Sequence, residues 1–332
     1  MSTQRAYRFS GCLLGVVLAV FAAWQCTSRG FDASIRHVTI DPTTRLEVVD
    51  WGGSGVPIVF LAGLGHTAHV FDDFAAPLTD QYHVLGITRR GFGASSQPDF
   101  GYNIPTLAED IRIVMDSLGI ERAVLVGHSL GGDEMTLFAR KHPQMVVALV
   151  YIEAAYNRAT ARDAMADYAA PESNVPPPSD KDKESAQAYR AYYARANGVT
   201  MPLSEIKAMY RWQPDGQFGG NRTPSFVFDG IVESIQDPDY SGIDVPALAI
   251  YATDYPVTEL FIDYDMRDAV TQRAMRTYHE AARRTDKLSR DYFRTHVGKG
   301  RVVEIRGAGH SLYITHASET LSAIRAFLAE VL

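Results

Sequence analysis

The fold is decided by the stretch Val124-Leu125-Val126-Gly127-His128-Ser129-Leu130-Gly131-Gly132. An apolar run ends abruptly in Gly-His-Ser-Leu-Gly, and residues compatible with a helix follow. The pattern predicts a buried strand, a very tight turn with Ser129 at its tip, and a helix that begins at once. We expect glycine at 127 and 131 because a side chain there would collide across so sharp a turn. Such a turn directs the positive N-terminal end of the helix at the serine hydroxyl.

The composition favours one large α/β domain with insertions. The chain has 332 residues, of which 46% are hydrophobic, so it can bury a large core. Its formal net charge is −7 without a basic stripe, and nucleic acid is not an expected partner. The two cysteines, Cys12 and Cys26, precede the domain, so the rest of the chain offers no disulfide, cysteine metal site or cysteine nucleophile. No metal and no organic cofactor is expected.

Residues 1–30 differ in character from the rest of the chain. Arg5 and Arg8 precede an uncharged apolar run over residues 11–24, which is the pattern of an export signal. An uncleaved membrane anchor stays open, because no charge occurs from Phe9 to Ser28. We therefore expect a protein that is periplasmic or secreted, or attached to a membrane through this segment.

Strand-like and helix-like segments alternate through the remaining chain. A hairpin is expected from residues 35–40 and 45–51, followed by buried strands at 56–62, 84–87, 123–126, 146–152, 245–251 and 301–305. Helices are expected from about residue 105 to 118, from the turn at Ser129 to about 141, over 264–297, and from 318 onward. This alternation predicts an α/β fold with a mostly parallel sheet covered on both faces.

Two helix starts carry capping signals. Thr106 and Glu109 stand at the spacing of a capping box, and Ser318 precedes the apolar stripe of the last helix. We expect Thr106 and Ser318 to cap these helices.

The segment 155–244 interrupts the alternation. It is polar, contains several prolines and scattered aromatic residues, and lacks a buried-strand run. We interpret it as a mostly helical cap over the carboxyl ends of the strands, where sites lie in open α/β sheets. The core would then consist of residues 31–154 and 245–332.

Four short motifs occur in a fixed order along the chain. They are Leu61–Gly65 after the third expected strand, Arg89–Ser96 after the fourth, Gly127–Gly131 at the sharp turn, and Gly307–His310 after the last strand. In this order they resemble the α/β-hydrolase superfamily from about residue 35 onward, and more narrowly its serine hydrolases with a cap insertion. The resemblance implies an oxyanion loop at the first motif, a nucleophile at the third and a catalytic base at the fourth.

Ser129 is the candidate nucleophile and His310 the candidate base. A serine hydroxyl needs an adjacent base to attack, and histidine suits this role because its pKa lies near neutrality. The resemblance assigns the oxyanion hole to the backbone N–H groups of Leu130 and Leu64. Ala62 stands where the family has a histidine, but a backbone donor does not depend on that side chain.

The sequence leaves the partner carboxylate open. The family commonly places an aspartate shortly after the strand that ends near residue 251, but Tyr255 occupies that position and Asp254 comes one residue early. The other family option is a carboxylate after the strand 146–152, which is Glu153. Either could orient His310 and stabilise the imidazolium. We prefer Glu153 by a narrow margin.

These residues predict a serine hydrolase that acts through an acyl-enzyme. A carboxylic ester of a small to medium apolar substrate is the expected target, although related enzymes cleave amides, lactones or C–C bonds. The alternative is a ligand-binding, receptor-like protein of the same fold without turnover. We expect structural roles for Arg89, Arg90, Asp133 and Glu134, as ion-pairing residues and helix-start carboxylates.

Overall fold

The computed structural model describes residues 33–332. The predictions for residues 1–30, including those for Cys12 and Cys26, concern a segment outside the described residues. Within the described part, no helix is both long and apolar enough to traverse a lipid bilayer.

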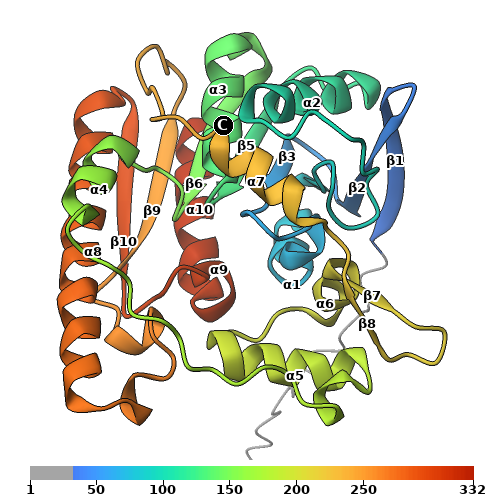
Figure 1. Ribbon diagram of the computed structural model, residues 1–332. Coiled ribbons are helices and arrows are strands. Elements are labelled where there is room, and N and C mark those ends of the chain that lie inside the picture. The colour runs from blue at the N-terminus through green and yellow to red at the C-terminus, as the bar shows by residue number, and fades with distance from the viewer. Residues whose placement is uncertain (1–32) are drawn as a thin grey trace, which may run out of the picture. The chain divides into compact units, whose positions relative to one another are not determined.

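A twisted central sheet organises the described chain (Figure 1). Its strand order is β1-β2-β4-β3-β5-β6-β9-β10. The strands are β1 Ser34–Asp41, β2 Thr44–Gly52, β3 Pro57–Leu61, β4 His83–Ile87, β5 Ala123–His128, β6 Val146–Ile152, β9 Ala247–Thr253 and β10 Gly300–Arg306. β2 pairs antiparallel with β1 and β4, and every other pairing is parallel. The expected mostly parallel sheet is confirmed.

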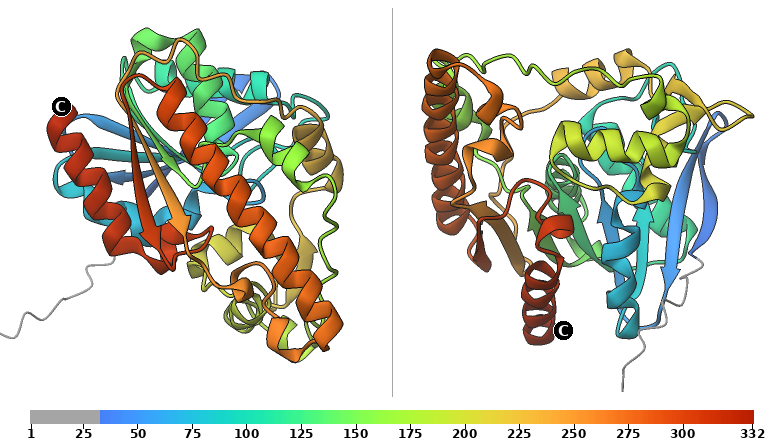
Figure 2. Two further views of the ribbon diagram at one scale, coloured as in Figure 1. Left: turned by 90° about the vertical axis from the view of Figure 1, so that its left-hand side faces the viewer. Right: turned by 90° about the horizontal axis from the view of Figure 1, so that it is seen from below.

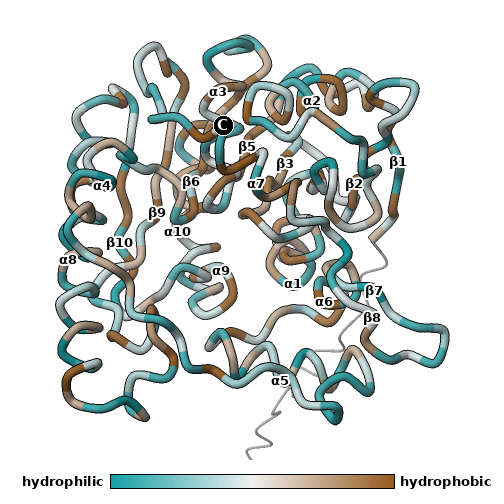
Figure 3. The backbone as a smooth tube through the Cα atoms, in the orientation of Figure 1, coloured by the Kyte–Doolittle hydropathy of each residue, from teal (hydrophilic) through white to brown (hydrophobic). Residues whose placement is uncertain are grey.

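Helices cover both faces of the sheet (Figure 2). One face packs against α1 Asp72–Ala75, α9 Leu312–Thr315 and α10 Ala317–Val331; the other packs against α2 Ile104–Ser117, α3 Gly131–Lys141 and α8 Ala269–His296. Alternation along β3 shows the division, because Ile58 and Phe60 face the first layer while Val59 and Leu61 face the second. The central strands are accordingly apolar along their length (Figure 3).

Both capping predictions are wrong. Asn103, in extended conformation, caps α2 by accepting a hydrogen bond from the Thr106 N–H at 3.0 Å, so the helix begins before Thr106. Ser318 lies inside the first turn of α10, which begins at Ala317. Because α9 ends only two residues earlier, its last turn leads almost directly into α10 and the Thr320 N–H bonds to the His316 carbonyl.

The cap contains helices and a small β-ribbon. The helices are α4 Arg158–Met165, α5 Ala186–Asn197, α6 Leu203–Met209 and α7 Ser225–Glu233, and the ribbon pairs β7 Tyr210–Trp212 with β8 Phe218–Asn221. The sequence prediction was mostly helical and missed the ribbon, whose strands are too short to show a period. Tyr189 of α5 stacks on Phe218 of the ribbon at 4.4 Å between ring centroids. These aromatic residues join the same hydrophobic cluster as the sheet face covered by α1, α9 and α10.

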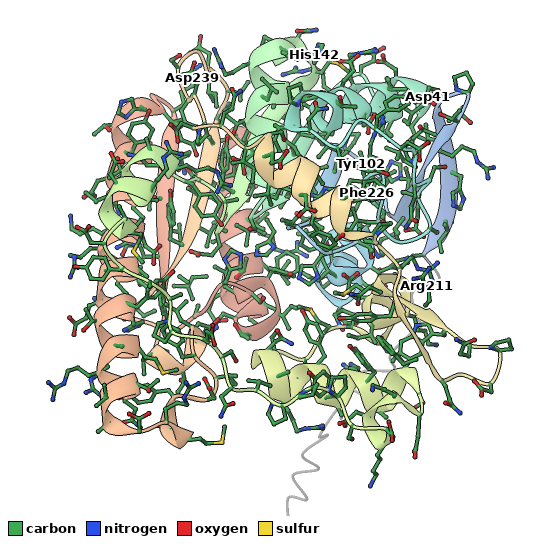
Figure 4. All side chains as sticks on the ribbon, in the orientation of Figure 1. Asp41, Tyr102, His142, Arg211, Phe226 and Asp239 are labelled. Carbon is green, nitrogen blue, oxygen red and sulfur yellow. The ribbon has the colours of Figure 1, made fainter. Side chains whose placement is uncertain are left out.

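The cap is joined to the core by side-chain contacts at separate points. Phe226 of α7 packs edge-on against Tyr102, which lies just before α2, at 5.7 Å (Figure 4). Val227 and Ile231 of the same helix are fully buried. α7 is thus packed firmly onto the α2 side of the molecule.

Candidate active site

Three strands end in the same unusual backbone conformation. Ser129 after β5, Glu153 after β6 and Asp254 after β9 have φ angles of 49°, 48° and 53°. They are the non-glycine residues with positive φ within residues 33–332. This conformation costs about 1–2 kcal/mol per residue, and such strain gathers at functional sites. Since β5, β6 and β9 are neighbours in the sheet, the three residues lie along one edge of it.

The turn at Ser129 is as sharp as the sequence predicts. A Cβ on Gly127 would lie 2.7 Å from the carbonyl carbon of Gly131, and a Cβ on Gly131 would overlap the Leu61 carbonyl oxygen. Only glycine therefore fits at either position. α3 begins at Gly131, so the N-terminus of this helix lies at the serine.

The loop after β3 lies directly against Ser129. A Cβ on Gly63 would come within 3.2 Å of the Ser129 Cβ, which shows how closely the two segments approach. Within residues 33–332, neither the Leu64 N–H nor the Leu130 N–H donates a hydrogen bond to a protein atom. Two backbone donors on neighbouring segments are thus available to an anion.

Arg89 fixes the shape of this loop. Its Nη1 donates to the Gly63 carbonyl at 2.8 Å, its Nη2 donates to the Ala62 carbonyl, and its Nε donates to Glu134 Oε1 at 2.8 Å. Burial raises the pKa of the Glu134 carboxyl, although Arg89 opposes that effect. The expected structural role of Arg89 and Glu134 is confirmed by these contacts, and Arg90 likewise pairs with Asp110. The sequence did not indicate that the Arg89 pair holds the Leu64 loop.

His310 reaches the site on the loop that follows β10. The Gly307 N–H bonds to the Thr253 carbonyl at 2.7 Å, which ties the start of this loop to β9. His128, the residue before Ser129, is fully buried and its Nε2 lies 3.0 Å from the His310 carbonyl oxygen. Burial and the neighbouring His310 hold the pKa of His128 well below its usual value. His128 is therefore neutral and donates its Nε2 proton to the His310 carbonyl.

Glu153 faces the His310 ring. Its Oε2 lies 3.6 Å from His310 Nδ1, and its Oε1 accepts a hydrogen bond from the Ala252 N–H at 2.6 Å. The side chain of Glu153 is 14% exposed and that of His310 is 51% exposed. The carboxylate is thus held in place from β9 while its other oxygen approaches the imidazole.

Asp254 does not contact His310. It pairs with Arg283 of α8 and lies 3.5 Å from Arg306 Nε, and half of its side chain is exposed. Tyr255, at the position where the family commonly has its acid, donates its hydroxyl to Asp286 of α8 at 2.6 Å. Burial raises the pKa of Asp286 to about 6. The structure thus brings Glu153 to His310 and directs Asp254 into an ion-pair cluster.

Tyr156 is a site residue that the sequence did not reveal. Its hydroxyl donates to the Glu153 carbonyl at 2.6 Å and lies 3.4 Å from Ser129 Oγ. The Arg158 guanidinium lies over its ring at 4.5 Å and pairs with Asp133. Burial raises the pKa of the phenol, so it stays protonated at neutral pH. Only its position at the start of the cap, one of many aromatic residues there, could have pointed to it.

Glu205 links the cap to the loop after β3. This carboxylate of α6 is fully buried, accepts the Thr67 N–H at 3.0 Å and also contacts the Thr67 hydroxyl. His66 Nδ1 lies 3.0 Å from the same carboxylate. A cap residue is therefore anchored immediately beside the Leu64 turn. No group of three or more His, Cys, Asp or Glu residues within 33–332 is arranged to hold a metal ion.

The sequence matches the family described as alpha/beta hydrolase fold over residues 56–317. The chain belongs to this family. Among curated members, a 2-(acetamidomethylene)succinate hydrolase of Mesorhizobium japonicum is 30% identical over 165 residues, which are 49% of this chain and 56% of that protein. A non-heme chloroperoxidase of Streptomyces lividans is 35% identical over 120 residues, 35% of this chain and 44% of that protein. The chain thus spans about half the length of these α/β hydrolase relatives.

Solved α/β hydrolase structures show the same fold over most of the chain. The crystal structure of E-2-(acetamidomethylene)succinate hydrolase has a TM-score of 0.64 at 22% identity, covering 90% of this chain and 99% of that chain. The esterase RhEst1 from a Rhodococcus species has a TM-score of 0.60 at 18% identity, covering 90% of this chain and all of that chain. At such identities the likeness establishes the fold alone.

Proposed function

We propose that this protein is a serine hydrolase that forms an acyl-enzyme on Ser129. The observation that carries the proposal is the meeting of three segments at one sheet edge. Ser129 lies in a strained turn against the Leu64 loop, and His310 lies 3.6 Å from Glu153 on the neighbouring strand end. These are the parts that acyl transfer by a serine requires: a nucleophile, a base, an acid that orients the base, and an oxyanion hole.

In this mechanism Ser129 Oγ bonds to the acyl carbon while its proton passes to His310 Nε2. The carbonyl oxygen gains negative charge and receives the N–H groups of Leu64 and Leu130. His310 then protonates the leaving oxygen, the bond to it breaks, and the acyl group remains on Ser129. A water molecule, deprotonated by the same histidine, then bonds to the acyl carbon. The bond from that carbon to Ser129 Oγ breaks, the serine takes back the proton from His310, and the acid is released. Glu153 stabilises the imidazolium in both halves of the reaction.

The Arg89–Glu134 pair supports the same step. Because Arg89 binds the carbonyls of Ala62 and Gly63, the peptide units on either side of Leu64 are fixed before substrate arrives. A donor that is already oriented needs no reorganisation when the oxyanion forms.

A carboxylic ester with a small to medium apolar part is the substrate class we propose. The aromatic residues of the cap, among them Phe228 next to Gly65, favour an apolar group near the oxyanion turn. Similar proteins are described with substrates other than simple esters, and one solved structure is described as an N-acyl homoserine lactone degrading enzyme. Amides, lactones and C–C bonds therefore belong in the substrate screen beside p-nitrophenyl esters of increasing chain length.

Labelling with a fluorophosphonate probe tests the proposal. We expect the wild-type protein to be labelled and Ser129→Ala to remain unlabelled, because the probe phosphonylates only an activated serine. Ser311→Ala, near His310 but outside the proposed reaction centre, is the matched control and should still be labelled. Absence of any labelling dependent on Ser129 would favour a receptor-like protein that binds ligands without turnover.

We further propose export or membrane attachment through residues 1–30, from the basic start and apolar run of that segment. N-terminal sequencing of the mature protein distinguishes the two. A new N-terminus near residue 22 supports a cleaved signal, and an intact Met1 in the membrane fraction supports an anchor.

A further inference from the structure

We propose that Glu259 is a positioning residue for His310, which it holds by the backbone while Glu153 faces the ring. The inference rests on the proposed function, since it assigns His310 as the base. Glu259 ends the short 3-10 turn Val257–Glu259 that follows β9. It therefore comes from the same strand end as Asp254, but from five residues further along the chain.

The contact with His310 is direct. Glu259 Oε1 accepts a hydrogen bond from the His310 N–H at 3.1 Å. His128 Nε2 meanwhile donates to the carbonyl of the same residue at 3.0 Å. Both backbone polar groups of His310 are thus hydrogen-bonded, the N–H by a carboxylate and the carbonyl by a neutral imidazole. Such bonds limit the positions that the His310 ring can reach.

The Glu259 carboxyl lies directly against Gly309, in space that any side chain at position 309 would occupy. A Cβ on Gly309 would coincide with the carboxyl group of Glu259. Gly309 does not have a positive φ, whereas Gly307 does, at 74°. Glycine at 309 therefore leaves space for the Glu259 carboxyl and is not needed for backbone conformation, and a methyl group there would displace the flexible end of Glu259 from the His310 N–H. Glu259 and Gly309 form a matched pair, in which the missing side chain makes room for the carboxylate.

Charge gives Glu259 a second effect on His310. Glu153 after β6, Asp286 of α8 and His128 are the other titratable groups close to His310, and His316 lies close enough to Glu259 to affect its charge. Burial raises the pKa of Glu259, and the His310 N–H and ring oppose that rise. When ionised, Glu259 stabilises positive charge on the His310 ring.

The substitutions Glu259→Gln and Glu259→Ala separate the two effects. Glutamine keeps an oxygen that accepts the His310 N–H but removes the charge, whereas alanine removes both. We expect Glu259→Gln to keep kcat within about threefold of wild type, because the His310 N–H retains its acceptor, whereas Glu259→Ala should lose kcat with little change in KM. Asp254→Asn is the control for charge loss at the same strand end and should leave both kinetic constants within about threefold of wild type.

A double-mutant cycle with Gly309→Ala tests the packing without any need for turnover. We expect Gly309→Ala to lower Tm when Glu259 is present, because the methyl group displaces the carboxylate from the His310 N–H, and to lower it less in the Glu259→Ala background, where the methyl group occupies the vacated space. Glu259→Ala alone should lower kcat about tenfold, because a displaced base is poorly aligned.

The outcomes separate this inference from the proposed function. If Gly309→Ala is equally harmful in both backgrounds, or if Glu259→Ala keeps the wild-type kcat, the positioning role is wrong. If Glu259→Gln loses as much kcat as Glu153→Gln, Glu259 is itself the acid and the positioning role is again wrong. If no labelling depends on Ser129, the hydrolase proposal fails, while the double-mutant cycle still decides whether Glu259 packs against Gly309 and holds the His310 backbone.

Discussion

The ends of β6 and β9 share a backbone conformation and differ in their surroundings. Glu153 and Asp254 have φ angles of 48° and 53°, and both are carboxylates one residue past a buried parallel strand. Glu153 is mostly buried, bound to the Ala252 N–H and close to His310. Asp254 is half exposed and paired with arginines. The same strained backbone conformation therefore places a carboxylate at both strand ends, and the neighbouring side chains determine which group each carboxylate binds.

Tyr255 explains why the two ends diverge. The phenol fills the place next to β9 where the family pattern has its acid, and its hydroxyl is bonded to Asp286 of α8. On the adjacent strand Glu153 has the length to reach the β9 backbone while still facing the histidine. The carboxylate next to His310 therefore follows β6, the second of the two family options, and not β9.

The largest difference in activity is expected between the two variants that remove the charge at these strand ends. We expect Glu153→Gln to reduce kcat by about 10³–10⁴-fold, because an amide neither fixes the histidine tautomer nor stabilises the imidazolium. Asp254→Asn should change kcat by less than about threefold, because its exposed ion pairs contribute little. Steady-state kinetics on the best ester of the panel measures both.

The two variants are matched, since each exchanges a carboxylate for an amide at a residue of positive φ. A reversed order would place the acid at Asp254, and equally mild effects would exclude both residues. Circular dichroism on the same preparations ensures that a loss of kcat is not a loss of folding.

The tyrosines near the two ends give a smaller contrast. We expect Tyr156→Phe to lower kcat about tenfold, because it removes a buried hydrogen bond to Glu153 and a polar neighbour of Ser129. Tyr255→Phe removes a bond to Asp286 and should change kcat by less than about threefold. Fluorophosphonate labelling rates provide a second measurement. If Tyr255→Phe is the more damaging change, the β9 end takes part in catalysis after all.

The sequence predicted the sheet and its order of elements because long apolar strands and helical stripes are local patterns. The turn at Ser129 was equally predictable, because the sequence has glycine at 127 and 131, the two positions where a side chain would collide across the turn. The choice between Glu153 and Asp254 could not be made in the same way. It depends on the direction of two side chains, and each has partners that are distant in the sequence. Glu153 is bound by the Ala252 N–H, and Asp254 is paired with Arg283 and Arg306.

The sequence could not identify Glu259 and Tyr156 as site residues for a related reason. Each lies in irregular chain just outside a predicted strand, where no periodicity distinguishes one carboxylate or one aromatic ring from another. Gly309 was the available signal for Glu259, because a glycine before the candidate base indicates a close approach. The sequence does not say which side chain makes that approach.

The last contrast concerns stability rather than activity, and depends on Asp286 behind the β9 end. Burial raises the pKa of its carboxyl from 3.8 to about 6, with Tyr255 and Arg290 opposing and Glu153 reinforcing the rise. The folded state therefore holds a proton that the unfolded state has released. The associated stability is fully present below about pH 4 and is lost as pH rises to about 6. Urea unfolding across this range should show that decline in wild type and a flatter profile in Asp286→Asn. Tyr255→Phe should extend the decline above pH 6, because it removes a hydrogen bond that favours the ionised form. An identical profile in all three proteins would mean that Asp286 titrates normally and that the β9 end is less enclosed than its contacts indicate.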